Sequence, residues 1–278
     1  MLLKNLQRKL RLVRQFVVSG VRASQYHDIF EGIETYCMFI GYPRSGHTLV
    51  GSLLDAHPEV VVGNELNTIR YVRYHFRRDQ IYWLLLENTR NFSQQGRWHT
   101  DYLYAVPDQW QGRYKRLRVI GDKRGSGSVK KIYANPRLYR RLVDMVGVPI
   151  RVIHVVRNPF DNISTIFLKG RSKNFQESID YYFFLAEEVS NLKQVIGEGN
   201  ILEIRHEDLI RDVPTYLREL TAFVGVGATP DYLAACSSIV FSKPHQTRND
   251  APWTEALIRD VSERIQRYPF LADYSFNK

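Results

Sequence analysis

The sequence predicts an α/β fold: a single three-layer domain in which a roughly five-stranded parallel sheet is flanked by helices. Short apolar runs alternate with longer segments of helical periodicity, as is typical of parallel strands joined by crossover helices. No internal repeat or low-complexity linker divides the 278 residues, and a hydrophobic content of 44% is ample for a large core. In such sheets ligands bind at the carboxyl ends of the strands.

Residues 1–30 are predicted to form a separate N-terminal element, and residues 31–278 the main domain. The first 25 residues contain six basic residues and no acidic one, and their apolar side chains recur at helical spacing: Leu3, Leu6, Leu10, Val13 and Val17. This pattern predicts a basic amphipathic helix. It either contacts a membrane surface or packs on the domain with a solvated basic face, which is the commoner arrangement. No stretch approaches the roughly 20 apolar residues of a spanning helix.

The first half of the domain is predicted to contain three strands, namely YCMFIG (36–41), EVVVG (59–63) and LRVIGDK (117–123). Residues 47–57 form a helix between the first two, because its leucines share one face and Pro58 follows its end. A mixed aromatic and basic helix is expected over 68–88. Residues 90–116 contain Gly96, Pro107 and Gly112 and are expected to be irregular.

The second half is predicted to supply two further strands, PIRVIHVVRN (149–158) and NILEIR (200–205). Helices are expected over 136–146, from about Phe160, and over 175–196, where apolar residues recur along one face. Further helices over 214–224 and 254–268 complete the pattern.

The decapeptide GYPRSGHTLV (41–50) joins the first strand to the first helix of the domain. Gly41 and Gly46 have the G-x-x-x-x-G spacing of a nucleotide phosphate loop, and Thr48 occupies its Ser/Thr position. However, His47 stands where that loop has Lys, and Arg44 supplies a charge within the loop. Amide groups at a helix N-terminus favour an anion. Without the Lys, the loop suits one phosphate better than a triphosphate with magnesium.

The segment Tyr42-Pro43-Arg44-Ser45-Gly46-His47-Thr48 resembles the 5′-phosphosulfate loop of the sulfotransferase family, whose donor is 3′-phosphoadenosine 5′-phosphosulfate (PAPS). The resemblance covers roughly residues 36–276 and implies a P-loop-like fold. It is closest in motif style to the tyrosylprotein, carbohydrate-type and bacterial small-molecule branches. It implies that the donor contacts Arg44, Ser45, Gly46, His47, Thr48 and Leu49. The family commonly has Thr at the position of His47.

A second motif follows the strongest strand. VIHVVRNPFDNIST (152–165) is similar to the family segment that binds the 3′-phosphate of PAPS, in which a Ser follows the Arg by seven or eight residues. The resemblance implies that Arg157 binds this phosphate together with Ser164 or Thr165. The usual spacing favours Thr165, and helix phase decides which hydroxyl faces the ligand.

Catalytic candidates also rest on the resemblance. LLDAHPEVVVGNELN (53–67) is similar to the tyrosylprotein and carbohydrate-type branches, which implies that Glu65 is the catalytic base. VIGDKRG (119–125) resembles the family's G-[DE]-K segment, which implies that Lys123, with Arg44, stabilises the departing oxygen. No metal is required if Lys and Arg neutralise the developing charge. His47, His75 and His99 are alternative bases.

Two later segments complete the candidate site. FSKPHQTRNDAPWT (241–254) resembles the late family segment that closes over the nucleotide, which implies phosphate contacts from Lys243 and Arg248. HEDL (206–209) resembles the family's Y-E-D-L, with His206 in place of Tyr on the adenine side.

The combined prediction is a cytoplasmic PAPS-dependent enzyme that transfers a sulfuryl group to a hydroxyl, or an amine, of a small metabolite or natural product. Cys37 and Cys236 have neither disulfide-framework nor metal-ligand spacing. One alternative is a P-loop kinase or another nucleotide-binding protein, although GHT replaces its GK[ST]. The other is a non-catalytic basic protein that binds nucleic acid or an anionic membrane, which the net charge of +10 would suit. No recognised nucleic-acid motif is present.

Overall fold

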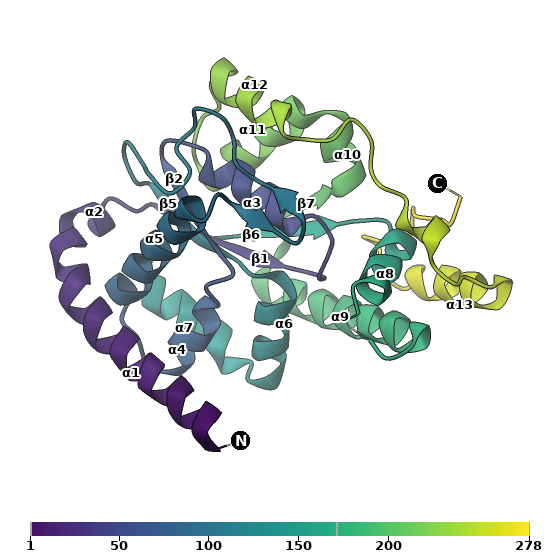
Figure 1. The fold of residues 1–278 in the computed structure, drawn as a ribbon, viewed down its shortest axis with the longest axis horizontal. Helices are drawn as coiled ribbons and strands as arrows, with labels where there is room; N and C mark the ends of the chain where they lie inside the picture. Colours follow the sequence, from purple (N-terminus) through teal and green to yellow (C-terminus); the bar gives the residue numbers. More distant parts are fainter. Residues whose placement is uncertain (1, 171, 278) are drawn as a thin grey trace.

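The protein folds around a five-stranded sheet of order β2-β5-β1-β6-β7, in which all neighbours are parallel. This computed structural model describes residues 2–170 and 172–277, with side chains from residue 6 onward. The strands are β1 (Thr35–Ile40), β2 (Val60–Asn64), β5 (Val119–Lys123), β6 (Ile150–Val156) and β7 (Ile201–Arg205). The predicted three-layer α/β fold is confirmed (Figure 1). Because β1 lies between β5 and β6, strand addition reverses beside it, and the loop after β1 lies at this switch point.

Both faces of the sheet are covered, so β1, β2, β5 and β6 are largely buried, whereas the edge strand β7 is only partly buried. Tyr36, Met38 and Ile40 of β1 join the larger, aromatic-rich core, while Cys37 and Phe39 point into a second core on the opposite face. Because successive side chains of a strand point to opposite faces of the sheet, β1 contributes to both cores. The four buried strands contain mostly apolar residues because neither of their faces meets water.

Helices form the two outer layers. The second core is covered by α3 (His47–Asp55) and α11 (Val213–Val224), with α12 (Pro230–Ser238) packed beyond them. The larger core is covered by α5 (Arg78–Gln94), α6 (Gly125–Ala134), α7 (Arg137–Val146), α8 (Pro159–Leu168), α9 (Phe175–Ile196) and α13 (Glu255–Ile265). Figure 1 shows these layers on either side of the sheet.

The helix predicted over 68–88 is in fact two helices. α4 (Thr68–Arg73) ends before Tyr74, and α5 begins at Arg78, because the chain turns at His75 with a φ of 59°. α5 extends to Gln94, into the segment predicted to be irregular. The rest of that segment includes a short hairpin of β3 (Trp98–His99) and β4 (Tyr102–Leu103). The sequence analysis also missed α6, α10 (His206–Arg211) and α12.

The N-terminal helix forms, but its apolar stripe does not pack on the domain. α1 (Leu2–Ala23) continues through η1 (Ser24–Tyr26) into α2 (His27–Glu31) and lies along α5. Leu6, Leu10, Val13 and Val17 are exposed, whereas the side chain of Leu3 lies outside the described residues. The helix docks through another face. Within the described part of the chain, no helix is long and apolar enough to cross a membrane.

Candidate active site

The loop at residues 41–46 connects β1 to α3 at the carboxyl edge of the sheet. Gly41, Arg44 and Gly46 adopt positive φ values of 125°, 70° and 99°, so the chain turns sharply before α3 begins. The carbonyl oxygen of Pro43 accepts a hydrogen bond of 2.9 Å from Asn162 of α8. The Tyr42 ring stacks on Tyr182 of α9, with 4.4 Å between centroids. The loop is therefore held by two helices, and the first-turn amides of α3, which have no intrahelical partner, follow it directly.

His47 lies beneath this loop. Its Nε2 donates to the carbonyl oxygen of Ile40 at 2.8 Å, and its Nδ1 lies 3.1 Å from Ser45 Oγ. A side chain at Gly125 would place Cβ 2.5 Å from the ring, so a residue without Cβ is needed beside it. Burial lowers the pKa of His47 to about 3 and keeps the ring neutral. These contacts argue against His47 as a base and favour a role in supporting the loop.

Ser45 is also directed into the loop. Its side chain is buried, and Ser45 Oγ donates to the carbonyl oxygen of Tyr42 at 3.1 Å. Its backbone amide, rather than its hydroxyl, is thus the group suited to an anion in this conformation.

Lys123 connects the loop with the end of β2. Its Nζ donates to Thr48 Oγ1 at 2.9 Å and lies 3.4 Å from Glu65 Oε1. The side chain is 4% exposed and runs across Gly51 of α3, where a Cβ would lie 2.8 Å from it. Burial lowers the pKa of Lys123, and the neighbouring Glu65 opposes that effect. One cation therefore touches both the phosphate-type loop and the candidate base.

Glu65 stands in a strained turn immediately after β2. Its φ is 59°, an unusual value for a residue with a side chain. Asp122 of β5 stabilises this turn, since its carboxylate accepts the amide hydrogens of Leu66 at 3.0 Å and Thr68 at 2.7 Å. The sequence analysis missed Asp122. Its place before Lys123 in the G-D-K segment was the available signal.

The electrostatics of Glu65 come from competing causes. Burial alone would raise the pKa of its carboxyl group, but Lys123, Arg124 and His99 together lower it. Arg124 Nη1 lies 3.1 Å from Glu65 Oε2. Because 44% of the Glu65 side chain is exposed, the carboxylate is ionised yet reachable from solvent. Of the other candidate bases, His75 bonds to Arg141 on α7, whereas His99 is close enough to influence Glu65.

Arg157 occupies the carboxyl end of β6 on the other side of the loop. Its Nη1 donates to the carbonyl oxygen of Arg44 at 3.3 Å and to Thr165 Oγ1 at 3.2 Å. Its Nε is a buried donor without a hydrogen bond to any described residue. This donor set fits a phosphate beside the loop. Ser164 points away, because its Oγ accepts from Trp253 Nε1 at 2.8 Å and donates to the carbonyl oxygen of Phe160.

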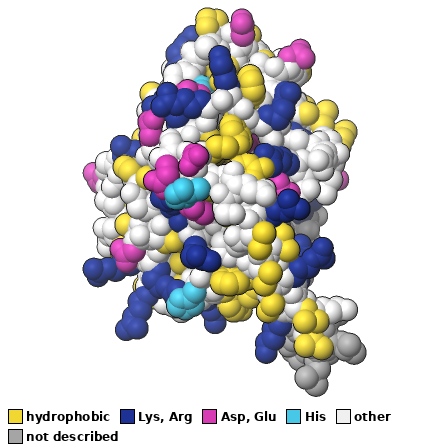
Figure 2. All heavy atoms as spheres, turned by 90° about the vertical axis from the view of Figure 1, so that its left-hand side faces the viewer, with side chains coloured by type: hydrophobic (Ala, Val, Ile, Leu, Met, Phe, Trp, Pro, Cys, Tyr) yellow, Lys and Arg dark blue, Asp and Glu magenta, His cyan; other side chains and the backbone are white. Residues whose placement is uncertain are grey.

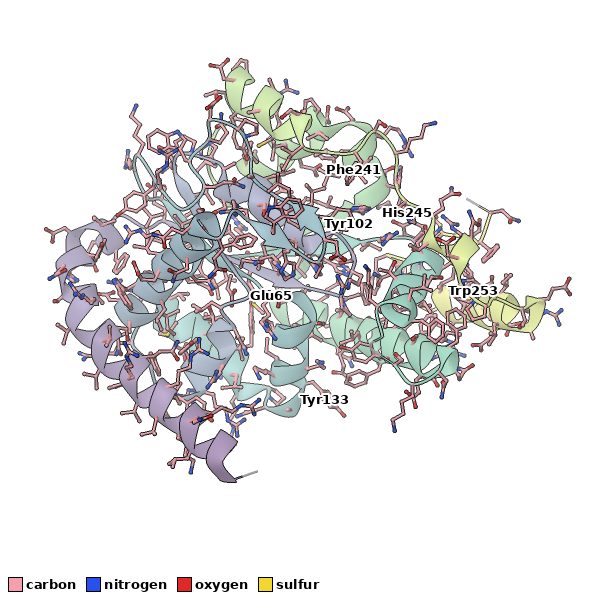
Figure 3. All side chains as sticks on the ribbon, in the orientation of Figure 1. Glu65, Tyr102, Tyr133, Phe241, His245 and Trp253 are labelled. Carbon is pink, nitrogen blue, oxygen red and sulfur yellow. The ribbon has the colours of Figure 1, made fainter. Side chains whose placement is uncertain are left out.

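The late segment crosses above Arg157. Arg157 Nη2 donates to the carbonyl oxygen of His245 at 2.6 Å, and Thr247 Oγ1 lies 2.8 Å from Thr165 Oγ1. Neither His245 nor Thr247 was identified from the sequence. The rings of Tyr102 and Phe241, both labelled in Figure 3, meet edge to face with 5.9 Å between their centroids. This segment therefore lies close to the β3–β4 hairpin.

The remaining cofactor candidates are placed less directly. Arg248 is buried in a two-point ion pair with Asp161, at 2.8 and 3.0 Å, and also bonds to the C-terminal segment. That pairing favours a structural role for Arg248. Lys243 is exposed on the late segment. His206, at the start of α10, lies against Gly46, where a Cβ would approach its ring to 2.3 Å.

Comparison with known proteins agrees with this architecture. A sequence model of the sulfotransferase family matches residues 38–230. That range includes the loop after β1, the Glu65–Lys123 pair and Arg157. No curated protein sequence is significantly similar to the chain.

Solved sulfotransferase structures share the fold. Mouse sulfotransferase SULT7A1, complexed with PAP, aligns with 13% identity and a TM-score of 0.50, covering 86% of each chain. Sulfotransferase STF9 from Mycobacterium avium aligns with 12% identity and a TM-score of 0.53, covering 92% of this chain and 82% of its own. The sulfotransferase domain of the Synechococcus PCC 7002 olefin synthase aligns with 14% identity and a TM-score of 0.50, covering 84% of this chain and 93% of its own. At these identities the likeness is evidence of the fold alone.

Proposed function

The chain belongs to the sulfotransferase family, and we propose that it transfers the sulfuryl group of PAPS to a hydroxyl, or an amine, of a small organic acceptor. One observation carries the proposal: Lys123 Nζ contacts Thr48 at the mouth of the loop and also lies 3.4 Å from Glu65. A donor phosphosulfate in the loop and an acceptor beside Glu65 would then meet at one cation.

The two ends of the donor would be held by residues that follow two different strands, β1 and β6. The first-turn amides of α3, with Arg44 and Thr48, suit the 5′-phosphosulfate. Arg157 and Thr165 suit the 3′-phosphate. The buried Nε of Arg157, which has no hydrogen bond to any described residue, supports this assignment. PAP, which is bound to the mouse structure, contains the same 3′-phosphate and is therefore the natural probe of this site.

Glu65 would act on the acceptor. Its ionised carboxylate takes the acceptor proton while the acceptor oxygen, or nitrogen, forms its bond to sulfur. The bond between sulfur and the bridging phosphate oxygen breaks at the same time, and Lys123 with Arg44 stabilises the charge that appears on that oxygen. Asp122 is a positioning residue, because it holds the turn that presents Glu65.

A small acceptor is consistent with the site's surroundings. Tyr102 and Phe241 expose 44% and 66% of their surfaces at the hairpin and late segment. Exposed rings beside a polar centre are suited to binding part of an organic molecule. The identity of the acceptor and a cytoplasmic location stay predictions.

The test combines donor binding with turnover. PAP should raise the melting temperature of the purified chain, and sulfur-labelled PAPS should transfer label to a component of a metabolite mixture. Glu65→Gln should lower turnover by about 10²- to 10⁴-fold, the usual contribution of a positioned base, while leaving PAP affinity intact. Glu34→Gln is the matched control, since Glu34 is an exposed carboxylate paired with Arg118. Full activity of Glu65→Gln would exclude Glu65 as the base.

A further inference from the structure

The outer face of α1 exposes a continuous apolar stripe. It consists of Leu6, Leu10, Val13, Val17 and Val21, which are 55%, 61%, 60%, 58% and 65% exposed. Spacings of four, three, four and four residues place these side chains on one face of the helix. Single exposed apolar residues need no explanation, but an aligned row of five on one helix does.

The helix itself is anchored, so the stripe belongs to the folded molecule. Ser19 and Ala23 are buried on the opposite face, which lies along α5. Gln80 of α5 donates to the carbonyl oxygen of Phe16 at 2.7 Å and to Ser19 Oγ at 3.2 Å. The Phe16 ring also meets Phe76 edge to face at 5.0 Å. α1 therefore presents the stripe outward in a fixed orientation.

Positive charge surrounds the stripe. Between residues 6 and 27 the chain has no acidic side chain, while its basic residues are Arg8, Lys9, Arg11, Arg14 and Arg22, all of them exposed. At about 100° per residue, Lys9 and Arg14 border the stripe on its two sides. Figure 2 looks onto the side of the molecule on which α1 lies and shows hydrophobic side chains among Lys and Arg.

From this arrangement we infer that α1 docks the enzyme on an anionic lipid surface, with the stripe at the acyl boundary and the flanking cations at the headgroups. Aliphatic residues bordered on both sides by cations are typical of a helix lying in the plane of a membrane interface. A second copy is a poorer occupant, because pairing two stripes would bring the basic borders of both helices together. Nucleic acid would leave the apolar stripe without a partner.

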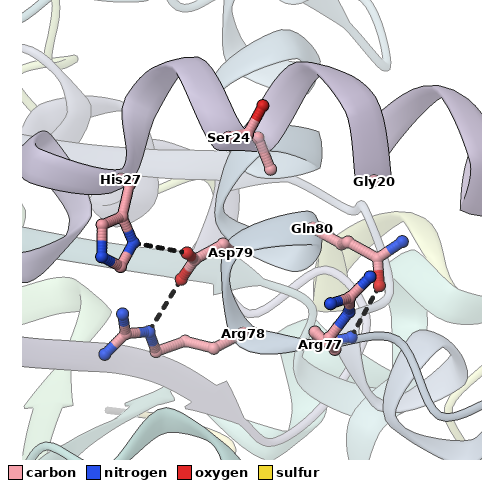
Figure 4. A pocket seen from close by; sticks show the side chains of 8 residues that line it. Gly20, Ser24, His27, Arg77, Arg78, Asp79 and Gln80 are labelled. Carbon is pink, nitrogen blue, oxygen red and sulfur yellow. Dashed lines mark hydrogen bonds and ion pairs between the residues drawn. The ribbon is translucent and has the colours of Figure 1, made fainter.

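A neighbouring pocket is a poor site for one specific headgroup. It has a volume of about 570 Å³ and lies between the end of α1 and the start of α5, where Gly20, Ser24 and His27 face residues 77–80 (Figure 4). Asp79 contacts both His27 and Arg78, and Glu31 also pairs with Arg78. Two carboxylates thus neutralise Arg78, and the pocket is not purely cationic. Binding should depend on the net charge of the lipid rather than on one headgroup.

Vesicle sedimentation with the full chain tests the inference. The protein should bind vesicles of phosphatidylcholine containing roughly one third phosphatidylserine, bind equally well when phosphatidylglycerol replaces the serine lipid, and bind weakly to phosphatidylcholine alone. Salt should weaken the binding. The double variant Leu10→Glu/Val17→Glu should lower the partition coefficient at least about tenfold, because it removes apolar contact and adds repulsion.

The matched control adds the same charge elsewhere. Val143→Glu/Val195→Glu alters exposed valines on α7 and α9 and should bind as the wild type does. Circular dichroism and the PAP-induced melting shift check that both variants fold. Equal binding by the stripe variant, or a stripe-dependent dimer without vesicle binding, would overturn the inference. Because the melting shift with PAP is read separately, failure here is distinguishable from failure of the proposed function.

Discussion

Replacement of Arg157 by alanine tests the two-ended donor site most directly. Arg157 Nη1 already donates to Thr165, and its buried Nε has no hydrogen bond to any described residue. If the 3′-phosphate of PAP is its ligand, Arg157→Ala removes one net charge-assisted hydrogen bond. That interaction contributes about 1.5–3 kcal/mol, which corresponds to about a 10- to 150-fold loss of PAP affinity.

The assay must separate this loss from damage to the loop, because Arg157 also donates to the carbonyl oxygens of Arg44 and His245. Adenosine 5′-phosphate provides the separation, since it lacks the 3′-phosphate. Calorimetric titration should show that wild type prefers PAP strongly and that Arg157→Ala loses most of that preference, with little change for adenosine 5′-phosphate.

Arg151→Ala is the control on the same strand. Arg151 lies near the opposite end of β6 and bonds to Gly199 and Asn200 on the surface, so PAP affinity should not change. Equal weakening of both nucleotides by Arg157→Ala would refute the assignment, because it would mean that Arg157 only shapes the loop.

Three further outcomes are expected. Thr165→Val should weaken PAP binding, whereas Ser164→Ala should leave PAP affinity unchanged, as measured by calorimetric titration. Ser164→Ala should instead lower the unfolding free energy by about 1 kcal/mol, as measured by urea unfolding. The folded-state pKa of His47, about 3, lies below its unfolded value, so stability falls as pH drops through the unfolded pKa. Between pH 7.5 and 5.5, the unfolding free energy of His47→Gln should therefore fall by about 1.4 kcal/mol less than that of the wild type, as measured by urea unfolding. An equal fall in both proteins would contradict a buried neutral ring. Arg97→Met should lower unfolding free energy by about 3–5 kcal/mol, because it leaves Asp55 buried without its cation; a change below 1 kcal/mol would contradict this.

Local patterns predicted the sheet well. Four of the five strands contain short apolar runs, because a parallel strand buried on both faces needs no polar alternation. The edge strand β7 is only partly buried and includes Glu203 and Arg205. The helices were harder to predict from the sequence. α6 begins with Gly-Ser-Gly-Ser, a segment of low helix propensity, and forms because Val129 and Ile132 pack into the core. The break between α4 and α5 depends on the turn at His75, which periodicity does not reveal.

The candidate site was predictable in its residue types but not in its contacts. Resemblance singled out Glu65 and Lys123 separately, whereas their proximity follows from the pairing of β2 with β5, in which Asn64 is opposite Lys123. The choice between Ser164 and Thr165 depended on helix phase, and the structure places Thr165 beside Arg157. Asp122 went unnoticed because its role exists only once the turn at Glu65 has formed. The functional roles of these residues stay predictions.

His47 occupies the position at which a nucleotide phosphate loop has Lys, and a buried cation, Lys123, comes to Thr48 from another strand. His47 turns inward to bond to Ile40, in a space that Gly41 and Gly125 leave open. With no long basic side chain at position 47, Lys123 reaches the loop from β5 across Gly51 and bonds to Thr48. A loop lysine would serve the donor alone, whereas Lys123 also lies beside Glu65. Lys123 thus places one positive charge at a strand end, between Thr48 and the proposed base Glu65.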